Sequence, residues 1–221
     1  EVGISSLRTS PLPKRVFREA KKLARVLRLF PYYQEQRGNA ADERWHLIES
    51  RLEVSDGNLL DIGCNIGVFT ARAAECGMMA LGFDPLEEAI ARARRAHQHM
   101  QHLAFMWLAL GPEHIGKLPH FDVTLCLSMH HYWYRAHGAE ICWRMIGDLV
   151  EKSGKLFFEP ASAHRRYGDE RPDFREHDPD SISQYVERNV RARFGAAKSV
   201  ELLGSTPSLN EETFRLLFLI R

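Results

Sequence analysis

Short apolar runs alternate with segments of helical periodicity from Arg44 onward. The apolar runs have the length of strands: NLLDI, MALGF, AFMWLAL, FDVTLCLS and KLFFE. Helical patterns lie before and between most of them, namely ERWHLIESRL, GVFTARAAEC, LEEAIARARRA and GAEICWRMIGDLV. Strands that alternate with helices form parallel β-α-β units. We therefore expect an α/β fold, a Rossmann-like doubly wound sheet with helices on both faces.

The end of the chain departs from this alternation. A helical pattern, SISQYVERNVRARF, precedes two apolar runs, SVELLG and FRLLFLIR, and only STPSLNEET separates the two runs. A connection of this length joins neighbouring antiparallel strands, because a parallel pair needs a longer crossover. The pattern predicts a terminal antiparallel pair.

Residues 1–43 are predicted to form an N-terminal helical arm in front of a domain over residues 44–221. The stretch PKRVFREAKKLARVLRLF has a proline near its start and apolar residues at helical spacing. Its other face is basic and holds Lys14, Arg15, Arg18, Lys21, Lys22, Arg25 and Arg28. This face either is solvated while the helix docks on the domain, or contacts a phosphate-bearing substrate, RNA or an anionic membrane surface.

Composition narrows the class of protein. A hydrophobic fraction of 44% supports a real core, and a net charge of +1 gives no general attraction to nucleic acid or membranes. The four cysteines lie far apart without a C-x-x-C pair, which predicts reduced thiols in a cytoplasmic protein. No uninterrupted apolar run is long enough to cross a bilayer.

The strongest chemical signal is the stretch LLDIGCNIGVFT, in which Asp61 closes a strand and a glycine-containing turn leads into a helix. Gly63 and Gly67 allow a tight turn and a close approach of the backbone to a ligand. Asp84 follows the next strand, about twenty residues after the turn, where an acid can bond both ribose hydroxyls. Strand, glycine turn, helix, strand and acid together predict a nucleoside-binding unit.

The glycine spacing disfavours a dinucleotide. A dinucleotide site has the pattern G-x-G-x-x-G, whereas this chain reads D-I-G-C-N-I-G, with Asn65 where a central glycine would stand. Asp61, before the first glycine, would also repel a diphosphate. Its charge suits a cationic amino-acid group instead.

Five features follow one another along the chain: LLDIGCNIG, GFD, FDVTLCLS, GKLFFEP and the terminal strand pair. Together they resemble the class I S-adenosylmethionine (SAM)-dependent methyltransferases. The resemblance covers roughly residues 44–221. It implies a seven-stranded sheet with the last strand antiparallel, and SAM as the cofactor. It also implies a set of cofactor-binding residues: Asp61, Gly63, Cys64, Asn65, Gly67, Asp84, Pro85 and Ser128.

A narrower resemblance rests on the order PYYQEQR, LDIGCNIG, LCLSMHHYW and LFFEP. This order is similar to bicoid-interacting RNA 5′-phosphate methyltransferases and to bacterial methyltransferases that cap a sugar chain on a phosphate or hydroxyl. In the RNA group, other polar residues usually stand at the positions of His130 and His131. By this resemblance Tyr33 and Arg37 belong to a lid over the cofactor.

Two adjacent histidines, His130 and His131, follow the fourth apolar run. Ligands of parallel α/β sheets bind beyond the carboxyl ends of the strands, and we therefore expect these residues beside the methyl acceptor. An imidazole can take a proton from a hydroxyl acceptor or orient the acceptor. An acceptor that is already an anion needs no base. The alternative is that one ring only caps the strand or the next helix.

The fifth run ends at Glu159, and His164, Arg165 and Arg166 follow it. Glu159 is a candidate for substrate binding, and His164, Arg165 and Arg166 are expected to clamp an anionic substrate. The alternative for these three residues is a solvated loop. Two aromatics, Tyr132 and Trp133, either form a platform for a sugar or base or pack on the following helix.

A metal site at the carboxyl ends of these strands is a less favoured interpretation. His130, His131, Glu159 and His164 come from the ends of adjacent strands, but adjacent histidines point in different directions. No H-x-x-x-H spacing supports a preformed site. We predict no metal.

The sequence predicts a SAM-dependent methyltransferase that transfers a methyl group to an oxygen of a sugar, a small metabolite or a terminal phosphate. The alternatives are an RNA end-modifying methyltransferase and a cofactor-binding partner subunit without chemistry of its own. A nicotinamide oxidoreductase is disfavoured by the missing third glycine and by Asp61.

Overall fold

The structure, a computed structural model, describes residues 38–53, 56–207 and 214–221. The predicted arm helix, Tyr33 and Arg37 lie outside the described residues. Helix α2, Gly38–Glu49, crosses the expected boundary between residues 43 and 44. The division of the chain at that boundary stays a prediction.

The described strands form one seven-stranded sheet in the order β3-β2-β1-β4-β5-β7-β6. The strands are β1 Asn58–Ile62, β2 Met79–Asp84, β3 Leu103–Trp107, β4 Phe121–Leu127, β5 Ser153–Glu159, β6 Val200–Pro207 and β7 Phe214–Ile220. Strands β1 to β5 are parallel, and β7 is antiparallel to both β5 and β6. The expected Rossmann-like sheet with an antiparallel last strand is confirmed.

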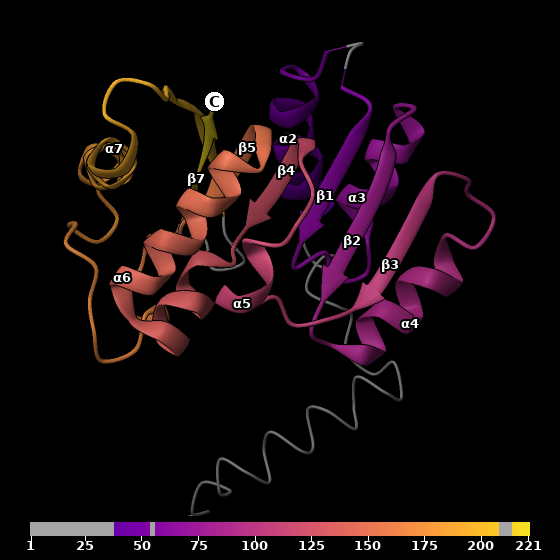
Figure 1. The fold of residues 1–221 in the computed structure, drawn as a ribbon, viewed down its shortest axis with the longest axis horizontal. Helices are drawn as coiled ribbons and strands as arrows, with labels where there is room; N and C mark the ends of the chain where they lie inside the picture. The colour runs from indigo at the N-terminus through magenta and orange to yellow at the C-terminus, as the bar shows by residue number, and fades with distance from the viewer. Residues whose placement is uncertain (1–37, 54–55, 208–213) are drawn as a thin grey trace, which may run out of the picture.

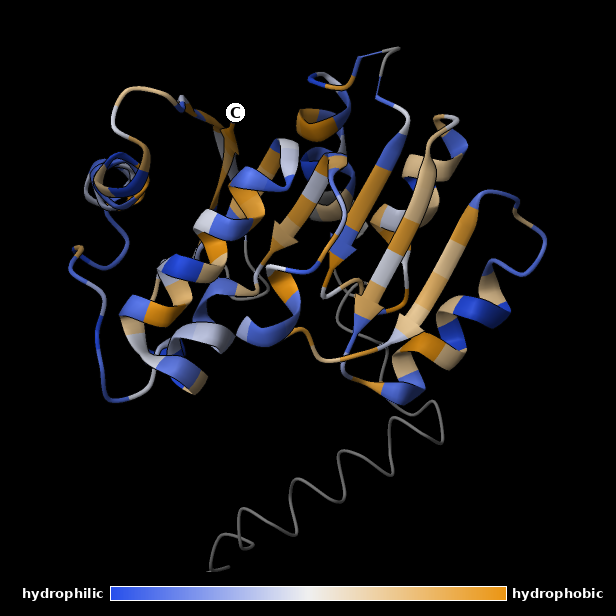
Figure 2. Cartoon of the chain, in the orientation of Figure 1, coloured by the Kyte–Doolittle hydropathy of each residue, from blue (hydrophilic) through white to orange (hydrophobic). Residues whose placement is uncertain are grey.

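Helices cover both faces of this sheet (Figure 1). Besides α2 they are α3 Val68–Glu75, α4 Glu87–Ala96, α5 Pro112–Ile115, α6 His130–Glu151 and α7 Pro179–Phe194, with a short 3-10 helix at His164–Arg166. Successive strand residues point to opposite faces: Leu59 packs with residues of α2 and α3, and Leu60 packs with residues of α5, α6 and α7. Figure 2 shows hydrophobic positions along the strands and polar positions on the outer sides of helices such as α4.

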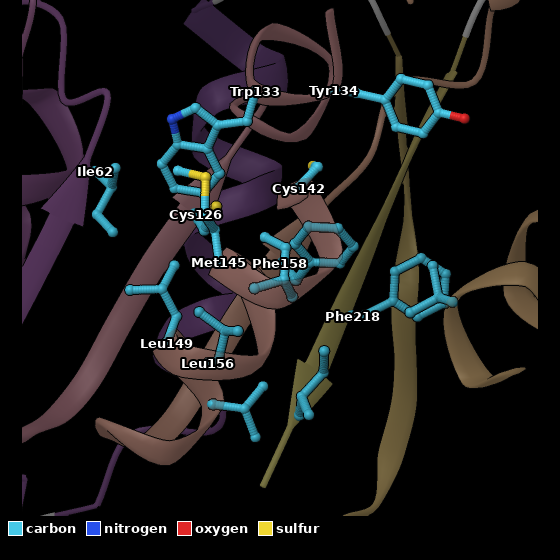
Figure 3. Packing of buried hydrophobic residues seen from close by; sticks show 14 of the residues in the cluster. Ile62, Cys126, Trp133, Tyr134, Cys142, Met145, Leu149, Leu156, Phe158 and Phe218 are labelled. Atoms are coloured by element: carbon cyan, nitrogen blue, oxygen red, sulfur yellow. The ribbon is translucent and has the colours of Figure 1, made fainter. Parts of the chain in front are cut away.

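The larger core cluster lies between the sheet and helices α5, α6 and α7. Trp133, Met145, Phe158 and Phe218 pack there, as Figure 3 shows, and each is no more than 4% exposed. This core fixes the strand ends on which the site is built.

Helix α6 begins eight residues earlier than expected. The sequence pattern predicts a helix from Gly138, but the structure has helix from His130, with a kink at Gly138 (φ 79°, ψ 171°). Glycine adopts this backbone conformation at little cost. Both histidines therefore lie in the first turn of a helix that packs on the sheet.

Candidate active site

The glycine turn lies directly beyond the carboxyl end of β1. The amides of Gly63 and Cys64 both donate to the carbonyl oxygen of Phe83, at 2.8 and 3.0 Å, which ties the turn to β2. Gly63 (φ +77°) and Gly67 (φ +80°) have left-handed backbones. A Cβ at Gly63 would lie 2.4 Å from the Met129 sulfur, and one at Gly67 would lie 2.4 Å from the Phe105 ring. Both positions require glycine, as the motif predicts.

Asp84 lies at the carboxyl end of β2 beside this turn and is 5% exposed. Its Oδ2 accepts from the Asn65 amide at 2.8 Å, and its Oδ1 accepts from the Leu86 amide at 2.8 Å. Burial raises the pKa of this carboxyl group, and the two backbone amides oppose that shift. The carboxylate is thus fixed in orientation while each oxygen keeps acceptor capacity for a ligand hydroxyl.

Asp61 lies one strand away and is 2% exposed. Its Oδ2 accepts from the Thr70 hydroxyl at 2.7 Å. Burial raises the pKa of Asp61 to about 7, the Thr70 bond opposes this shift, and the charge of Asp84 adds to it. Without a cationic partner, this carboxylate is costly to ionise in the folded chain.

This cost predicts a pH-dependent effect of Asp61→Asn. The folded pKa, about 7, lies above the ordinary value of 3.8, so folding favours the protonated form and stability falls as pH rises from about 4 through 7. Asparagine cannot ionise and avoids this loss. In urea unfolding without cofactor, we expect the free energy of unfolding of Asp61→Asn to exceed that of the wild type by roughly 3–4 kcal/mol at pH 8.5. The two values should match near pH 4.

The control for this measurement is Asp169→Asn, because Asp169 is exposed. That variant should follow the wild type within about 0.5 kcal/mol at both pH values. If Asp61→Asn is no more stable than the wild type at pH 8.5, the ionised Asp61 does not destabilise the fold and this prediction is wrong.

The remaining cofactor candidates differ in what they present. Asn65 has a left-handed backbone (φ 53°), and its side-chain oxygen accepts from the Ile66 amide at 2.9 Å. Cys64 is buried, and burial raises the pKa of its thiol, so it stays protonated. Pro85 is exposed, and its carbonyl accepts from the Trp107 ring N–H at 3.1 Å. Asn65 and Pro85 thus lie beside Asp84, and the part of these residues in cofactor binding stays a prediction.

A buried network of ion pairs lies at the carboxyl ends of β4 and β5, beside the start of β7. Glu159, fully buried, pairs with Arg44 of α2 and with Arg215 of β7, each at 3.1 Å. Ser128, which follows β4 with a left-handed backbone (φ 63°), donates to Glu159 Oε1 at 2.5 Å and accepts from Arg215 at 2.5 Å. Ser128 and Glu159 were expected at the ends of these strands, whereas no sequence motif singles out Arg44 or Arg215.

His130 lies in an aromatic core and not on the surface. It is 0% exposed, and the rings of Tyr134, Trp143, Phe158, Tyr167 and Tyr185 surround it. The Tyr167 hydroxyl donates to the Ala161 carbonyl at 2.9 Å and therefore accepts from His130 Nδ1–H at 3.1 Å. Burial lowers the pKa of His130 to about 3. This geometry favours a packing role for His130 over a chemical one.

His131 is 2% exposed and lies closer to charged groups. Burial lowers its pKa to about 3, and the charges of Arg215, Arg166 and Arg135 add to the shift. Its Nδ1 is buried without a hydrogen-bond partner among the described residues. A neutral ring of this kind is a weak base and is better suited to orient an acceptor.

A pocket opens beyond β5 and the start of β7. Its lining is Ala161, Ser162, Ala163, Arg165, Arg166, Phe214 and Arg215. His164, expected with the two arginines, is turned away: its Nε2 donates to the Phe174 carbonyl at 2.8 Å. The expected arginine pair thus lines a pocket, together with Arg215.

The two aromatic candidates fall in different environments. Trp133 is 4% exposed, and its ring N–H donates to the Leu110 carbonyl at 3.1 Å. Tyr132 is 54% exposed and lies beside His131, with ring centroids 4.2 Å apart and the rings tilted by 36°. The structure favours packing for Trp133 and leaves Tyr132 accessible to a substrate.

Neither a metal site nor a membrane span is found within the described residues. No group of three or more His, Cys, Asp or Glu side chains there is arranged to hold a metal ion. No helix in that part of the chain has the length and apolar character needed to cross a bilayer.

A comparison with known families finds one match, in the central part of the chain. A family model described as "Methyltransferase domain" matches residues 60–156, which include the glycine turn, Asp84 and the two histidines. No curated protein sequence matches the chain. The matched segment is less than half of the chain, and the solved structures below share its fold.

Several solved structures share this fold. The bifunctional kinase-methyltransferase WbdD is 23% identical with a TM-score of 0.66; the match covers 84% of this chain and 41% of WbdD. Magnesium protoporphyrin IX methyltransferase (ChlM) from Synechocystis PCC 6803, with bound SAH, is 17% identical with a TM-score of 0.61. This match covers 94% of this chain and 97% of ChlM. The chain thus spans about two fifths of WbdD and nearly all of ChlM. A further ChlM structure holds SAM.

Proposed function

We propose that the chain binds SAM over the ends of β1 and β2 and transfers its methyl group to an oxygen of a sugar, a small metabolite or a terminal phosphate. The observation that carries this proposal is the Asp84 carboxylate, buried and fixed by two backbone amides beside the glycine turn. Such a carboxylate can accept hydrogen bonds from both hydroxyls of a ribose. The relatives whose structures hold SAM or SAH support the choice of nucleoside.

The residues at this edge fit the proposed cofactor. Asp84 would hold the ribose, and the backbone of the Gly63–Gly67 turn would follow the methionine part. Asp61, costly to ionise alone, would gain a cationic partner from the ammonium group, which lowers the pKa of a neighbouring carboxyl. When bound, SAM supplies an electrophilic methyl group on a sulfonium.

The acceptor would lie over β4, β5 and β7, next to the proposed cofactor position. Met129, which follows Ser128, lies against Gly63, and Ser128 is bonded to Arg215 of the pocket lining. These contacts make a continuous row from the glycine turn to the arginine pocket. Holding two reactants in line at short range supplies much of the rate acceleration in such transfers.

His131 is proposed to orient the acceptor, and His130 to support it from the aromatic core. Burial and a pKa of about 3 for both rings argue for orientation over proton removal. Tyr132, Arg165 and Arg166 are proposed to contact the acceptor from the accessible side. Roles of Tyr33 and Arg37 in a lid remain part of the proposal from resemblance.

Two alternatives keep specific support. An RNA end would meet the basic sequence of residues 13–30, and its binding would weaken steeply with salt. A partner subunit without chemistry would bind SAM but transfer nothing.

Calorimetric titration of SAM and NAD into the wild-type chain tests the proposal. We expect SAM to bind with a dissociation constant in the micromolar range and NAD to show no binding, because the turn lacks a diphosphate cradle. Transfer of labelled methyl from SAM to sugars, sugar phosphates and RNA ends would then identify the acceptor class. Preference for NAD, or no binding of SAM, would contradict the proposal.

A further inference from the structure

We propose that the oxygen that receives the methyl group belongs to an oxoacid anion, a phosphate monoester or a carboxylate, seated in the pocket of Arg165, Arg166 and Arg215. This inference rests on the proposed function, because it names the substrate class of the same site. It adds Arg215, which no sequence motif singled out.

The pocket lining is cationic and otherwise apolar or hydroxylic. Three of its seven residues are arginines, and it contains neither a carboxylate nor an imidazole. Ser162, the one hydroxyl-bearing residue of the lining, donates to the Phe214 carbonyl at 2.7 Å. Guanidinium groups pair with carboxylate and phosphate oxygens in a bidentate manner, which a neutral hydroxyl acceptor does not exploit.

The three arginines are held in different ways. Arg215 is 4% exposed and fixed by Glu159 and Ser128, so its position is set by the fold. Arg165 is exposed and Arg166 half-buried, and neither side chain forms an ion pair with the described residues. One buried arginine held by the fold and two arginines that are more exposed thus offer guanidinium N–H donors to the same pocket, which suits an anion.

The two described acid–base groups beside Arg215, Glu159 and His131, are poorly suited to remove a proton. Glu159 is fully buried and paired with two arginines. His131 is 2% exposed beside the positive charges of Arg166 and Arg215, which oppose its protonation. A neutral alcohol must lose a proton during transfer, whereas an oxoacid anion has already lost it at neutral pH.

The transfer then balances without a proton acceptor. An oxygen lone pair of the anion forms the new O–C bond to the methyl carbon. The S–C bond breaks, and its electron pair stays on sulfur, giving the neutral thioether of S-adenosylhomocysteine. The anion loses one negative charge and the sulfonium its positive charge, and the product is a methyl ester.

Calorimetric titration of inorganic phosphate and of acetate into the full chain saturated with S-adenosylhomocysteine tests the subsite, at constant ionic strength maintained with chloride. We expect at least one anion to bind, with a stoichiometry near one. Arg166→Gln should weaken that binding by about tenfold or more, as removal of one charged hydrogen bond does. Arg165→Gln should act in the same direction. The affinity for S-adenosylhomocysteine should stay unchanged in both variants.

The matched control is Arg171→Gln, an exposed arginine five residues after Arg166 and outside the pocket lining. It removes the same charge and should leave anion binding unchanged. Stronger binding of phosphate supports a phosphate monoester, and stronger binding of acetate supports a carboxylate. Failure of both anions to bind, or equal weakening by Arg171→Gln, would overturn the subsite.

The two proposals fail separately in this design. If S-adenosylhomocysteine binds while neither anion does, only the acceptor inference is wrong. If S-adenosylhomocysteine does not bind, the proposed function is wrong, and anion binding measured without it still decides whether the arginine pocket is a site.

Discussion

Replacing Asp84 with asparagine is expected to lower the affinity of the chain for SAM by about a hundredfold. Each carboxylate oxygen accepts one backbone N–H, from Asn65 and from Leu86. An amide has one acceptor oxygen, so its NH2 group would face a backbone donor or the ribose in place of the second oxygen. The variant thus loses a charged acceptor for the ribose and disturbs the turn that carries the cofactor. Calorimetric titration of SAM at pH 7.5 measures the change.

Glu88→Gln is the matched control, because Glu88 is an exposed acid in the first turn of α4, four residues after Asp84. Its SAM affinity should equal that of the wild type, which separates a specific contact from a change in net charge. A thermal melt of Asp84→Asn without ligand shows how much of the loss comes from a less stable turn. Wild-type affinity in Asp84→Asn would remove Asp84 from the ribose site.

The strands were predictable because each is a short, self-contained signal. NLLDI matches β1 in full, β2 and β4 differ from their apolar runs by one residue at an end, and β5 differs by two. A buried parallel strand is apolar on both faces, and its sequence therefore stands out without knowledge of its neighbours. The glycine turn and Asp84 follow for the same reason, since they lie at fixed positions after two such strands.

The beginning of α6 was not predictable from local pattern. Met129, the residue before the helix, makes no side-chain cap, and the helix starts with two histidines and two aromatics, which have only moderate helix propensity. Gly138 instead suggested a helix start. In the structure Gly138 is a kink between two helical segments, and core packing of Trp133 and Tyr134 holds the first segment in place.

The interpretation of the histidines depended on that helix. A pair of imidazoles beyond a strand end suggests an exposed site, but the first turn of α6 directs His130 into the aromatic core. Periodicity does not report such a turn when the helix itself is missed. The network of Arg44, Glu159 and Arg215 escaped for another reason: its members come from α2, β5 and β7, and no local spacing links them.

Glu159→Gln is expected to destabilise the chain by about 3–5 kcal/mol, the usual effect of removing one partner from a buried ion pair. Arg44 is 3% exposed and Arg215 is 4% exposed, and both pair with Glu159, which is fully buried. Glutamine leaves two buried guanidinium groups without this carboxylate. It also weakens the acceptor for the Ser128 hydroxyl, whose residue holds a left-handed backbone. Urea unfolding at pH 7 measures the loss.

Glu201→Gln provides the matched control, because Glu201 also pairs with two arginines but at the surface. Its oxygens lie 2.7 Å from Arg51 and 3.1 Å from Arg221, and its side chain is 35% exposed. Water replaces such partners easily, so the expected loss is at most about 1 kcal/mol. Equal losses in the two variants would show that burial adds nothing to the Glu159 network. A large loss only at Glu159 would mean that the position of Arg215, and with it the anion pocket, depends on a carboxylate that no substrate needs to touch.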